Sequence, residues 1–309
     1  MQEYIEKLAF GRGFAQTRFF PLLPLPRWRR NAEARGLCHG MPFDLRGAFP
    51  WAKCVIFLVW AYSPFPPGQR VSPYYLASNQ AYHASKALAA DVTAQGFRCE
   101  PAFLPARALA LACGAGQPGR NGLLSIAPYG TRVALFTLVT NACDPADAAL
   151  PGLPCPADCQ ACIRACPGGA ISIQGLDVTK CLRYHMDAPI RPDLIKERQA
   201  TFLGCEICQA ACPKNAGLSP VSPPEEALRA FDLLRLIRGD ASAARALVGR
   251  NMTSGGKLTG EAIVFAARDG LYEAEIRECL SSPFPAVQQA AQWALNRFET
   301  KRSENIIKV

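Results

Sequence analysis

The chain has 309 residues, and 34 Lys and Arg against 25 Asp and Glu give a formal net charge of +9. Its length allows a substantial core, and a hydrophobic content of 50% excludes an intrinsically disordered protein. The apolar runs at 55–62 and 133–140 are far shorter than the roughly twenty residues of a membrane-spanning helix. The N-terminus lacks the apolar segment of a secretory signal. We therefore expect a cytoplasmic protein with no membrane association.

Residues 1–150 predict a mixed α/β domain. The run at 55–62 is β-branched and aromatic, which is typical of a buried strand. Residues 79–95 follow the period of a helix, and 132–140 predict a second strand. A glycine-rich stretch at 113–122 lies between that helix and that strand. On its own, this stretch indicates either a simple turn or a place where the backbone closely approaches a large ligand.

The second half divides at proline-rich segments. One connector covers 144–158, and a further boundary falls at 220–224. We expect domains at 151–218 and 219–309. Helices are predicted at 225–238, 260–268, 273–280 and 286–298. The last three are typical of one pair of a stacked-helix repeat, which cannot bury its apolar face alone and should dock on the rest of the protein.

Fourteen cysteines determine the class of protein, because eight of them fall between 155 and 212. Clustering at short, fixed spacing is typical of metal ligands, whereas a disulfide framework belongs to secreted chains. Cys54 and Cys279 are interpreted as buried small hydrophobes, and Cys113, beside the glycine-rich stretch, stays ambiguous. The six cysteines outside the cysteine-rich segment are Cys38, Cys54, Cys99, Cys113, Cys143 and Cys279.

Two motifs carry seven of the eight clustered cysteines, and Cys181 lies between them. The first is Cys155-Pro-Ala-Asp-Cys159-Gln-Ala-Cys162-Ile-Arg-Ala-Cys166-Pro, and the second is Cys205-Glu-Ile-Cys208-Gln-Ala-Ala-Cys212-Pro. Each ends in C-x2-C-x3-C-P, the run used by bacterial two-cluster ferredoxins, in which the last cysteine ligates the other cluster. Crossed ligation predicts one [4Fe-4S] set of Cys155, Cys159, Cys162 and Cys212. It predicts a second set of Cys166, Cys181, Cys205 and Cys208.

Zinc held by four thiolates at each site is the alternative. Paired x3-C-P endings are not typical of zinc ribbons, so iron–sulfur cubes are favoured. The first motif departs from the usual form, because its leading spacing is C-x3-C. Two cubes form a one-electron wire, and the preceding domain predicts a reductase in which the wire feeds a second redox cofactor.

Several segments resemble the epoxyqueuosine reductase family. The family's A-G-L-G-W-x-G-K-N/H stretch corresponds to Cys113-Gly-Ala-Gly-Gln-Pro-Gly-Arg-Asn121, and P-x-Y-G to Ala127-Pro128-Tyr129-Gly130. A Tyr-His pair is retained at Tyr82-His83, and C-I-S-Y corresponds to Cys181-Leu-Arg-Tyr184. The final G-C-D-I-C-Q-x-x-C-P-W-N corresponds to the run from Gly204 to Asn215.

This resemblance implies a cobalamin-dependent reductase with two [4Fe-4S] clusters that makes the last reduction in queuosine synthesis on tRNA. The family is related to the reductive dehalogenases. The implied layout is an α+β chain with a nitroreductase-like cobalamin domain, a two-cluster ferredoxin-like module and a C-terminal HEAT-like repeat. An external donor of ferredoxin or flavodoxin type, tRNA and a monomeric state are also implied. The implied cofactor-binding residues are Tyr82, His83, Gly114, Gly116, Arg120, Asn121, Tyr129, Gly130 and Tyr184.

Three departures indicate a divergent paralogue. The family's catalytic Asp falls on Glu100, which is either the general acid or marks its loss. The family's two tryptophans are Gln117 and Lys214 here. A non-catalytic electron carrier or cobalamin-activating protein is the alternative, and an RNA-binding module with structural clusters is another. The basic cluster Arg27, Arg29, Arg30 and Arg35 with Trp28 fits either a tRNA phosphate contact or an ordinary solvated surface.

Overall fold

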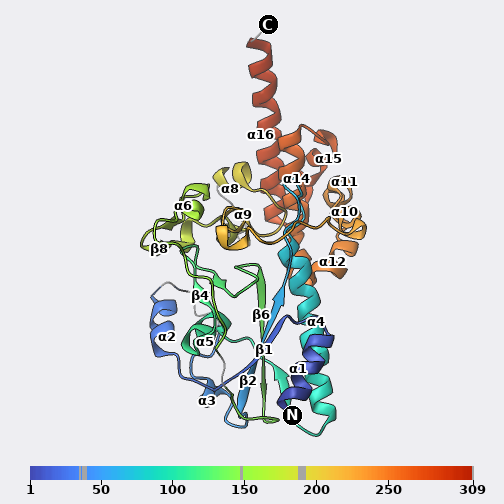
Figure 1. The fold of residues 1–309 in the computed structure, drawn as a ribbon. Coiled ribbons are helices and arrows are strands. Elements are labelled where there is room, and N and C mark those ends of the chain that lie inside the picture. Colours follow the sequence, from blue (N-terminus) through green and yellow to red (C-terminus); the bar gives the residue numbers. More distant parts are fainter. Residues whose placement is uncertain (35, 37–39, 147–148, 187–192, 308–309) are drawn as a thin grey trace. The chain divides into compact units, whose positions relative to one another are not determined.

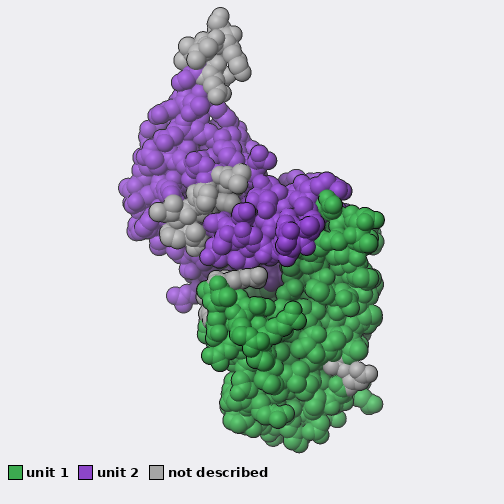
Figure 2. Space-filling model, turned by 90° about the vertical axis from the view of Figure 1, so that its left-hand side faces the viewer, with its two compact units in different colours: residues 1–63, 77–160, 212–219 green, residues 64–76, 161–211, 220–309 purple. Residues whose placement is uncertain are grey.

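The computed structural model describes residues 1–34, 36, 40–146, 149–186 and 193–307, and the Cys38, His39 and Arg35 of the sequence lie outside these ranges. The chain divides into two compact units (Figure 2). Unit 1 comprises residues 1–63, 77–160 and 212–219, and unit 2 comprises 64–76, 161–211 and 220–309. Each unit therefore contains segments that are distant in the sequence.

Unit 1 is built on a four-stranded antiparallel sheet of order β1-β2-β6-β3 (Figure 1). The central pair is β2 (Cys54–Ala61) with β6 (Val133–Thr140), and its register places Ile56 opposite Leu138. The flanking strands are β1 (Gln16–Phe20) and β3 (Cys99–Pro101). The two predicted strands are confirmed to within one residue, because their β-branched and aromatic composition matches a buried pleated surface.

Both faces of β2 are buried, and they alternate as the pleat requires. Val55, Phe57 and Val59 enter one core with Leu109 of α5 (Ala106–Ala112). Ile56 and Leu58 enter the other core with residues of α1 (Gln2–Gly11) and α4 (Pro73–Ala94). A strand covered on both faces has a continuous apolar sequence, as this one does.

Helix α4 begins six residues before the predicted helix at 79–95. Pro73 is its first residue, where the missing N–H of proline has no intrahelical partner to lose. Its end agrees with the prediction, because Gly96 follows with a φ of +86° that stops the helix. The other elements of unit 1 are α2 (Pro26–Glu33), α3 (Leu45–Ala48) and the hairpin of β4 (Gln117–Pro118) with β5 (Leu124–Ser125).

The cysteine-bearing part of unit 2 is made of short elements joined by turns. They are α6 (Ala161–Ala165), β7 (Ile171–Ser172), β8 (Gly175–Leu176), α7 (Leu182–His185), α8 (Asp193–Arg198) and α9 (Ile207–Ala210). Strands β7 and β8 pair in an antiparallel hairpin. Such short elements bury little apolar surface, so they depend on other interactions to hold one conformation.

The C-terminal part of unit 2 is helical, as predicted, but the helix expected at 225–238 is wrong in its continuity. It is broken into α10 (Glu225–Ala230) and α11 (Leu233–Ile237), because the Asp232 carboxylate caps α11 by accepting from Arg235 N at 2.9 Å. The remaining helices are α12 (Ser242–Val248), α13 (Arg250–Thr253), α14 (Lys257–Asp269), α15 (Glu273–Glu278) and α16 (Pro285–Ile307).

Helix α14 forms the centre of this helical part. Most of its residues are buried, and it packs against α11 and α16 (Figure 1). Phe265 of α14 packs against Phe202, which stacks on Phe231. In the part of the chain that the structure describes, every helix is too short or too polar to cross a bilayer.

We expect Leu58→Ala to destabilise the protein by about 2–5 kcal/mol, because Leu58 is fully buried and truncation leaves a cavity between the sheet and its helices. The matched control is Phe10→Ala, since the Phe10 side chain is 78% exposed. It should change the free energy of unfolding by no more than about 0.5 kcal/mol. Urea unfolding followed by circular dichroism measures both. Equal losses in the two variants would contradict the assignment of this core.

Candidate functional site

Four of the predicted ligands lie together in unit 2. Cys166 follows α6, Cys181 precedes α7, and Cys205 and Cys208 lie before and on α9. Burial, together with negative charge on Cys181 and Cys166, raises the pKa of Cys205 to about 11. Burial also raises the pKa of Cys208 to about 12, and negative charge on Cys205, Cys181, Cys162 and Cys166 acts in the same direction. These four thiols, which the crossed arrangement assigns to one cube, lie near one another, but Cys162, which it assigns to the other cube, also lies near Cys208. The assignment of each thiol to a cube stays a prediction.

Three of the other four predicted ligands lie in unit 1. Burial raises the pKa of Cys212, and negative charge on Cys155 and Cys159 acts in the same direction, so these three sulfurs are neighbours. Cys162, the fourth, is buried on α6, which begins the 161–211 segment of unit 2. Thiols that hold their protons must release them when a metal binds, so loading of this module is coupled to proton release.

Among the described residues, no three Cys, His, Asp or Glu side chains converge closely enough to hold a single ion.

Arg120 anchors the loop that carries Cys155 and Cys159. Its guanidinium donates to the carbonyl oxygens of Ala157 at 2.7 Å, Pro156 at 3.3 Å and Cys159. Burial raises the pKa of the Cys155 thiol, but the Arg120 N–H and the positive charge of Lys214 outweigh it, so this pKa is lowered overall. The two basic residues therefore stabilise negative charge at this end of the module.

The segment 212–219 is fixed to unit 1 through Asn215. Its side-chain oxygen accepts from Thr131 N at 2.8 Å, and its amide nitrogen donates to Thr131 Oγ1 at 3.0 Å. Asn215 is only 7% exposed. Gly130 has a φ of +59°, and a β-carbon there would lie 2.5 Å from Lys214 O and closer still to the Asn215 oxygen. Gly130 therefore allows the close approach that positions Cys212.

The glycine-rich stretch forms the β4–β5 hairpin and its flanks. Gly116 has a φ of +74°, and a β-carbon there would lie 2.9 Å from Leu124 and from Ser125 O. Gly116 N also donates to Leu150 O at 2.8 Å. Asn121 is buried, and its side-chain oxygen accepts from Leu123 N at 3.2 Å. These two residues thus shape the loop itself, whereas Gly114 faces open space.

The remaining predicted cofactor residues are distributed more widely. Tyr82 and His83 both lie on the exposed side of α4, with their rings 5.3 Å apart. Tyr129 is half-buried beside the core that contains Leu109 and Ile126. Tyr184 of α7 is 51% exposed and belongs to unit 2.

Glu100, the candidate general acid, lies on β3 opposite Val139. Its carboxylate pairs with Arg98 Nε at 2.7 Å, and its side chain is 47% exposed. The Arg98 guanidinium in turn lies 3.9 Å from the centre of the Trp51 ring. These contacts give Glu100 a role in an exposed charge pair at the sheet edge, so its assignment as an acid stays a prediction.

Sequence reasoning missed the positioning residues Thr131 and Arg120 in this role. Thr131 carries no motif of its own, and its pairing with Asn215 joins residues 84 positions apart. Arg120 was assigned to the cofactor because it aligns with a family lysine, whereas its side chain reaches the loop before Cys159. Lys214 was noted only as a departure, although a cation directly after the last Cys-Pro was a readable signal.

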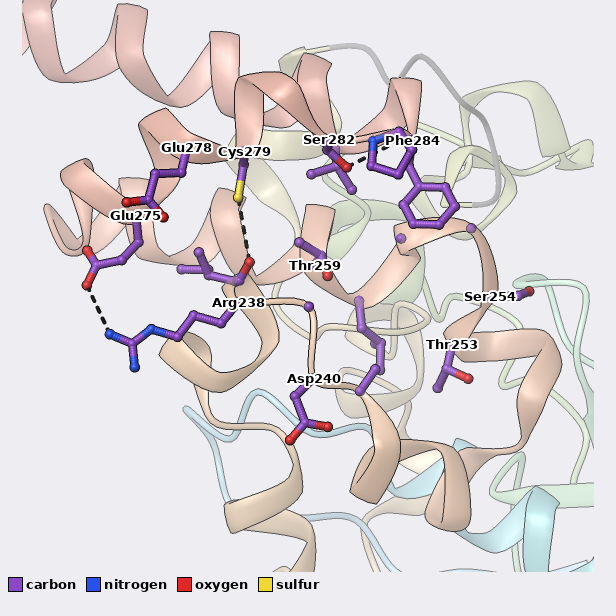
Figure 3. A pocket seen from close by; sticks show the side chains of 18 of the residues that line it. Arg238, Asp240, Thr253, Ser254, Thr259, Glu275, Glu278, Cys279, Ser282 and Phe284 are labelled. Carbon is purple, nitrogen blue, oxygen red and sulfur yellow. Dashed lines mark hydrogen bonds and ion pairs between the residues drawn. The ribbon is translucent and has the colours of Figure 1, made fainter.

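A separate hollow of about 710 Å³ lies among the C-terminal helices of unit 2 (Figure 3). Arg238 and Glu275 meet across it, with nitrogen and oxygen 3.7 Å apart. Cys279 lines it and donates to Ile237 O at 3.5 Å. None of the predicted ligands or cofactor residues lines this hollow.

Comparison with known proteins agrees with the chemistry of the cysteines. The family described as a 4Fe-4S double cluster binding domain matches residues 155–215. The chain is 34% identical to an epoxyqueuosine reductase of Lactococcus garvieae over 126 residues, which is 38% of this chain and 34% of that protein. It is 28% identical to an epoxyqueuosine reductase of Listeria monocytogenes over 217 residues, 65% of this chain and 56% of that protein.

Solved structures extend the likeness to the fold. An epoxyqueuosine reductase from Streptococcus thermophilus matches with a TM-score of 0.74 at 20% identity, covering 96% of this chain and 90% of that one. An epoxyqueuosine reductase with a tRNA stem loop matches with a TM-score of 0.75 at 19% identity over the same shares. The chain is thus similar in part of its sequence, and in its fold, to epoxyqueuosine reductases. It spans between a third and three-fifths of the length of these two curated relatives.

We expect Gly130→Ala to destabilise the protein more than Gly114→Ala. Both glycines have positive φ values, so each alanine costs about 1–2 kcal/mol of backbone strain. Only at position 130 does the new β-carbon also collide with Lys214 and Asn215. The thermal unfolding temperature and the iron content of anaerobically prepared protein should both fall further for Gly130→Ala. Indistinguishable variants would mean that the contact between Gly130 and Asn215 does not position Cys212.

Proposed function

We propose that this protein is an iron–sulfur reductase that uses cobalamin to reduce epoxyqueuosine in tRNA or a related electrophile. The observation that carries the proposal is the double-cluster module at 155–215 combined with the fold of epoxyqueuosine reductases. A two-cluster wire that is joined to a larger α/β unit has a place to deliver electrons. A ferredoxin- or flavodoxin-type protein is the proposed external donor.

The eight thiols fit two cubes in number and in kind. We assign Cys155, Cys159, Cys162 and Cys212 to one cluster, and Cys166, Cys181, Cys205 and Cys208 to the other. Lys214 and Arg120 favour negative charge at Cys155, which suits a cube whose four thiolates and iron core carry net negative charge. The Ala170 N–H, 3.3 Å from Cys166 Sγ, supplies a hydrogen bond of the kind that tunes cluster potentials.

The proposed corrin site is the glycine-rich stretch with Tyr129 and the exposed Tyr82 and His83. Its support is one orphaned polar atom: Ser125 Oγ on β5 is fully buried and has no hydrogen-bond partner in the part of the chain that is described. The amide side chains of a corrin ring are suitable partners for a hydroxyl group. When bound, the cobalt would supply the low-potential metal centre that reduces the substrate. Gly114, which faces open space, would admit the ring edge.

Helix α2 is the proposed contact for tRNA phosphates. None of its residues is buried, and Arg27 and Arg30 are exposed, while Arg29 pairs with Glu33. Sequence-independent phosphate contacts of this kind make binding fall steeply with salt. A monomeric state and domains at 1–150, 151–218 and 219–309, the last a HEAT-like repeat, complete the proposal. The packing of α14 against α16 is consistent with such a repeat.

Paired substitutions test the crossed ligation. Cys155→Ala with Cys212→Ala removes two ligands of one proposed cube and should retain about four of the expected eight or so irons per chain. Cys155→Ala with Cys166→Ala removes one ligand from each cube and should retain fewer. If each motif instead held a cube of its own, Cys155 and Cys166 would belong to the same cube. The second pair of substitutions would then retain more iron than the first. Iron analysis of anaerobically purified protein measures both pairs, and Cys279→Ala should keep the parental content.

The activity is tested with anaerobically purified protein supplied with hydroxocobalamin and a chemical reductant. A tRNA stem loop that carries epoxyqueuosine should be converted to its queuosine form, which consumes two electrons and two protons and releases water. Mass spectrometry of the nucleosides measures conversion, and the Cys155→Ala, Cys166→Ala pair should abolish it. Failure to retain corrinoid contradicts the proposal. Corrinoid retained without turnover of this substrate favours the electron-carrier or activating role.

A further inference from the structure

Three cysteines outside the cluster motifs gather at one end of the sheet in unit 1. Cys54 opens β2 and Cys99 opens β3, and both lie in register with Thr140 at the end of β6. Cys143 follows three residues later. The exposed fractions of Cys54, Cys99 and Cys143 are 0%, 7% and 8%. A single buried cysteine is normally a small hydrophobe, but three at one place can react with each other.

Two of these cysteines are already in contact. The Cys54 and Cys143 sulfurs are 3.3 Å apart, although the residues are 89 positions apart in the chain. A disulfide bond is about 2.05 Å long, so the sulfurs need to approach by only about 1.3 Å. A hydrogen-bonded turn holds Cys143 there, in which the Asn141 side chain accepts from Arg98 N at 2.8 Å and Thr140 Oγ1 accepts from Ala142 N at 3.1 Å.

We propose that Cys54 and Cys143 are a redox modification site that forms a reversible disulfide when the protein meets hydrogen peroxide. The Cys143 sulfur attacks one peroxide oxygen and the O–O bond breaks. This step releases one water and converts Cys143 to a sulfenic acid. The Cys54 sulfur then attacks the Cys143 sulfur, the S–O bond breaks, and a second water leaves. Two thiols lose two electrons and two protons, and the peroxide is reduced to two waters.

The surroundings divide the two roles between the cysteines. The hydrogen bond from Cys54 lowers the pKa of Cys143 despite burial, and the charges of the N-terminal amine and Lys53 act in the same direction. The same hydrogen bond, followed by burial, raises the pKa of Cys54. Cys143 is also the more exposed of the two, at 8% against 0% for Cys54. The thiolate is the nucleophile, so Cys143 attacks and Cys54 resolves. Burial raises the pKa of Cys99 to about 12, so Cys99 remains a thiol beside the pair.

The bond would join the first residue of β2 to the segment that leaves β6. A crosslink over so long a loop restricts the unfolded chain strongly, so the oxidised form should unfold at a higher temperature. This site lies entirely in unit 1 and uses no cluster ligand. The proposal is therefore independent of the cofactors and of the reaction proposed above.

Peptide mapping of the anaerobically purified protein tests the proposal directly. Portions with and without hydrogen peroxide are denatured in N-ethylmaleimide and digested without reductant by trypsin and by a protease that cuts before Asp. Cys54, Cys143 and Cys99 then lie on separate peptides, 54–70, 133–143 and 99–107, apart from every cluster ligand. Peptides 54–70 and 133–143 should be linked only after peroxide and should separate on reduction.

Two variants accompany the mapping. After peroxide, Cys143→Ser should lack the linked peptide and melt below the equally treated parent, whereas Cys279→Ser should behave as the parent does. The readout in the parent chain does not depend on whether a variant folds. Recovery of Cys54 as its maleimide adduct while Cys143 carries sulfinic or sulfonic acid would overturn the proposal. A link from Cys54 to Cys99 would overturn it as well.

Discussion

The pairing of β2 with β6 is the interaction on which unit 1 depends. Eight residues of each strand are in register, and β2 contributes alternate side chains to two separate cores. A one-residue slip would exchange those two faces, so the register is strongly specified. Each end of β6 also carries a site: Thr131 precedes it and binds Asn215, and Cys143 follows it and meets Cys54. One strand thereby sets the position of a segment that carries a predicted ligand and of the proposed disulfide.

The sequence predicted the parts of the fold that follow local rules. The two long strands and the C-terminal helices show in composition and period, and Gly96 stops α4 as expected. The break between α10 and α11 depends on whether Asp232 faces solvent as a helix residue or turns to cap the next helix, which period alone does not decide. The division into two units was not foreseeable either. Residues 64–76 belong to unit 2 although they interrupt unit 1 in the sequence, and residues 212–219 belong to unit 1 although they interrupt unit 2. No local sequence pattern indicates such long-range membership.

The site shows the same division between local and non-local information. Cysteine spacing predicted that Cys166, Cys181 and Cys205 lie near one another, because that spacing is set by short turns, but it did not predict that Cys162 lies near Cys208. The partner of Arg120 could not be predicted, because it is a run of carbonyl oxygens about forty residues away rather than a residue type. Resemblance assigned Arg120 by alignment, but alignment transfers a position and not the direction of its side chain. The same applies to Glu100, whose carboxylate pairs with Arg98.

The basic residues at 120 and 214 have a common physical consequence. Both positions are basic here, and both act on Cys155, which leads the first motif with the longer C-x3-C spacing. A longer spacing allows the loop more conformations, which costs entropy when the loop is ordered around a cluster. The three carbonyl contacts of Arg120 restrict that loop beforehand. Lys214 favours the thiolate that the cluster requires. We interpret the two cations as compensation for the unusual spacing, so that the extra residue and the replacement of the family's tryptophan by Lys214 form one coupled change.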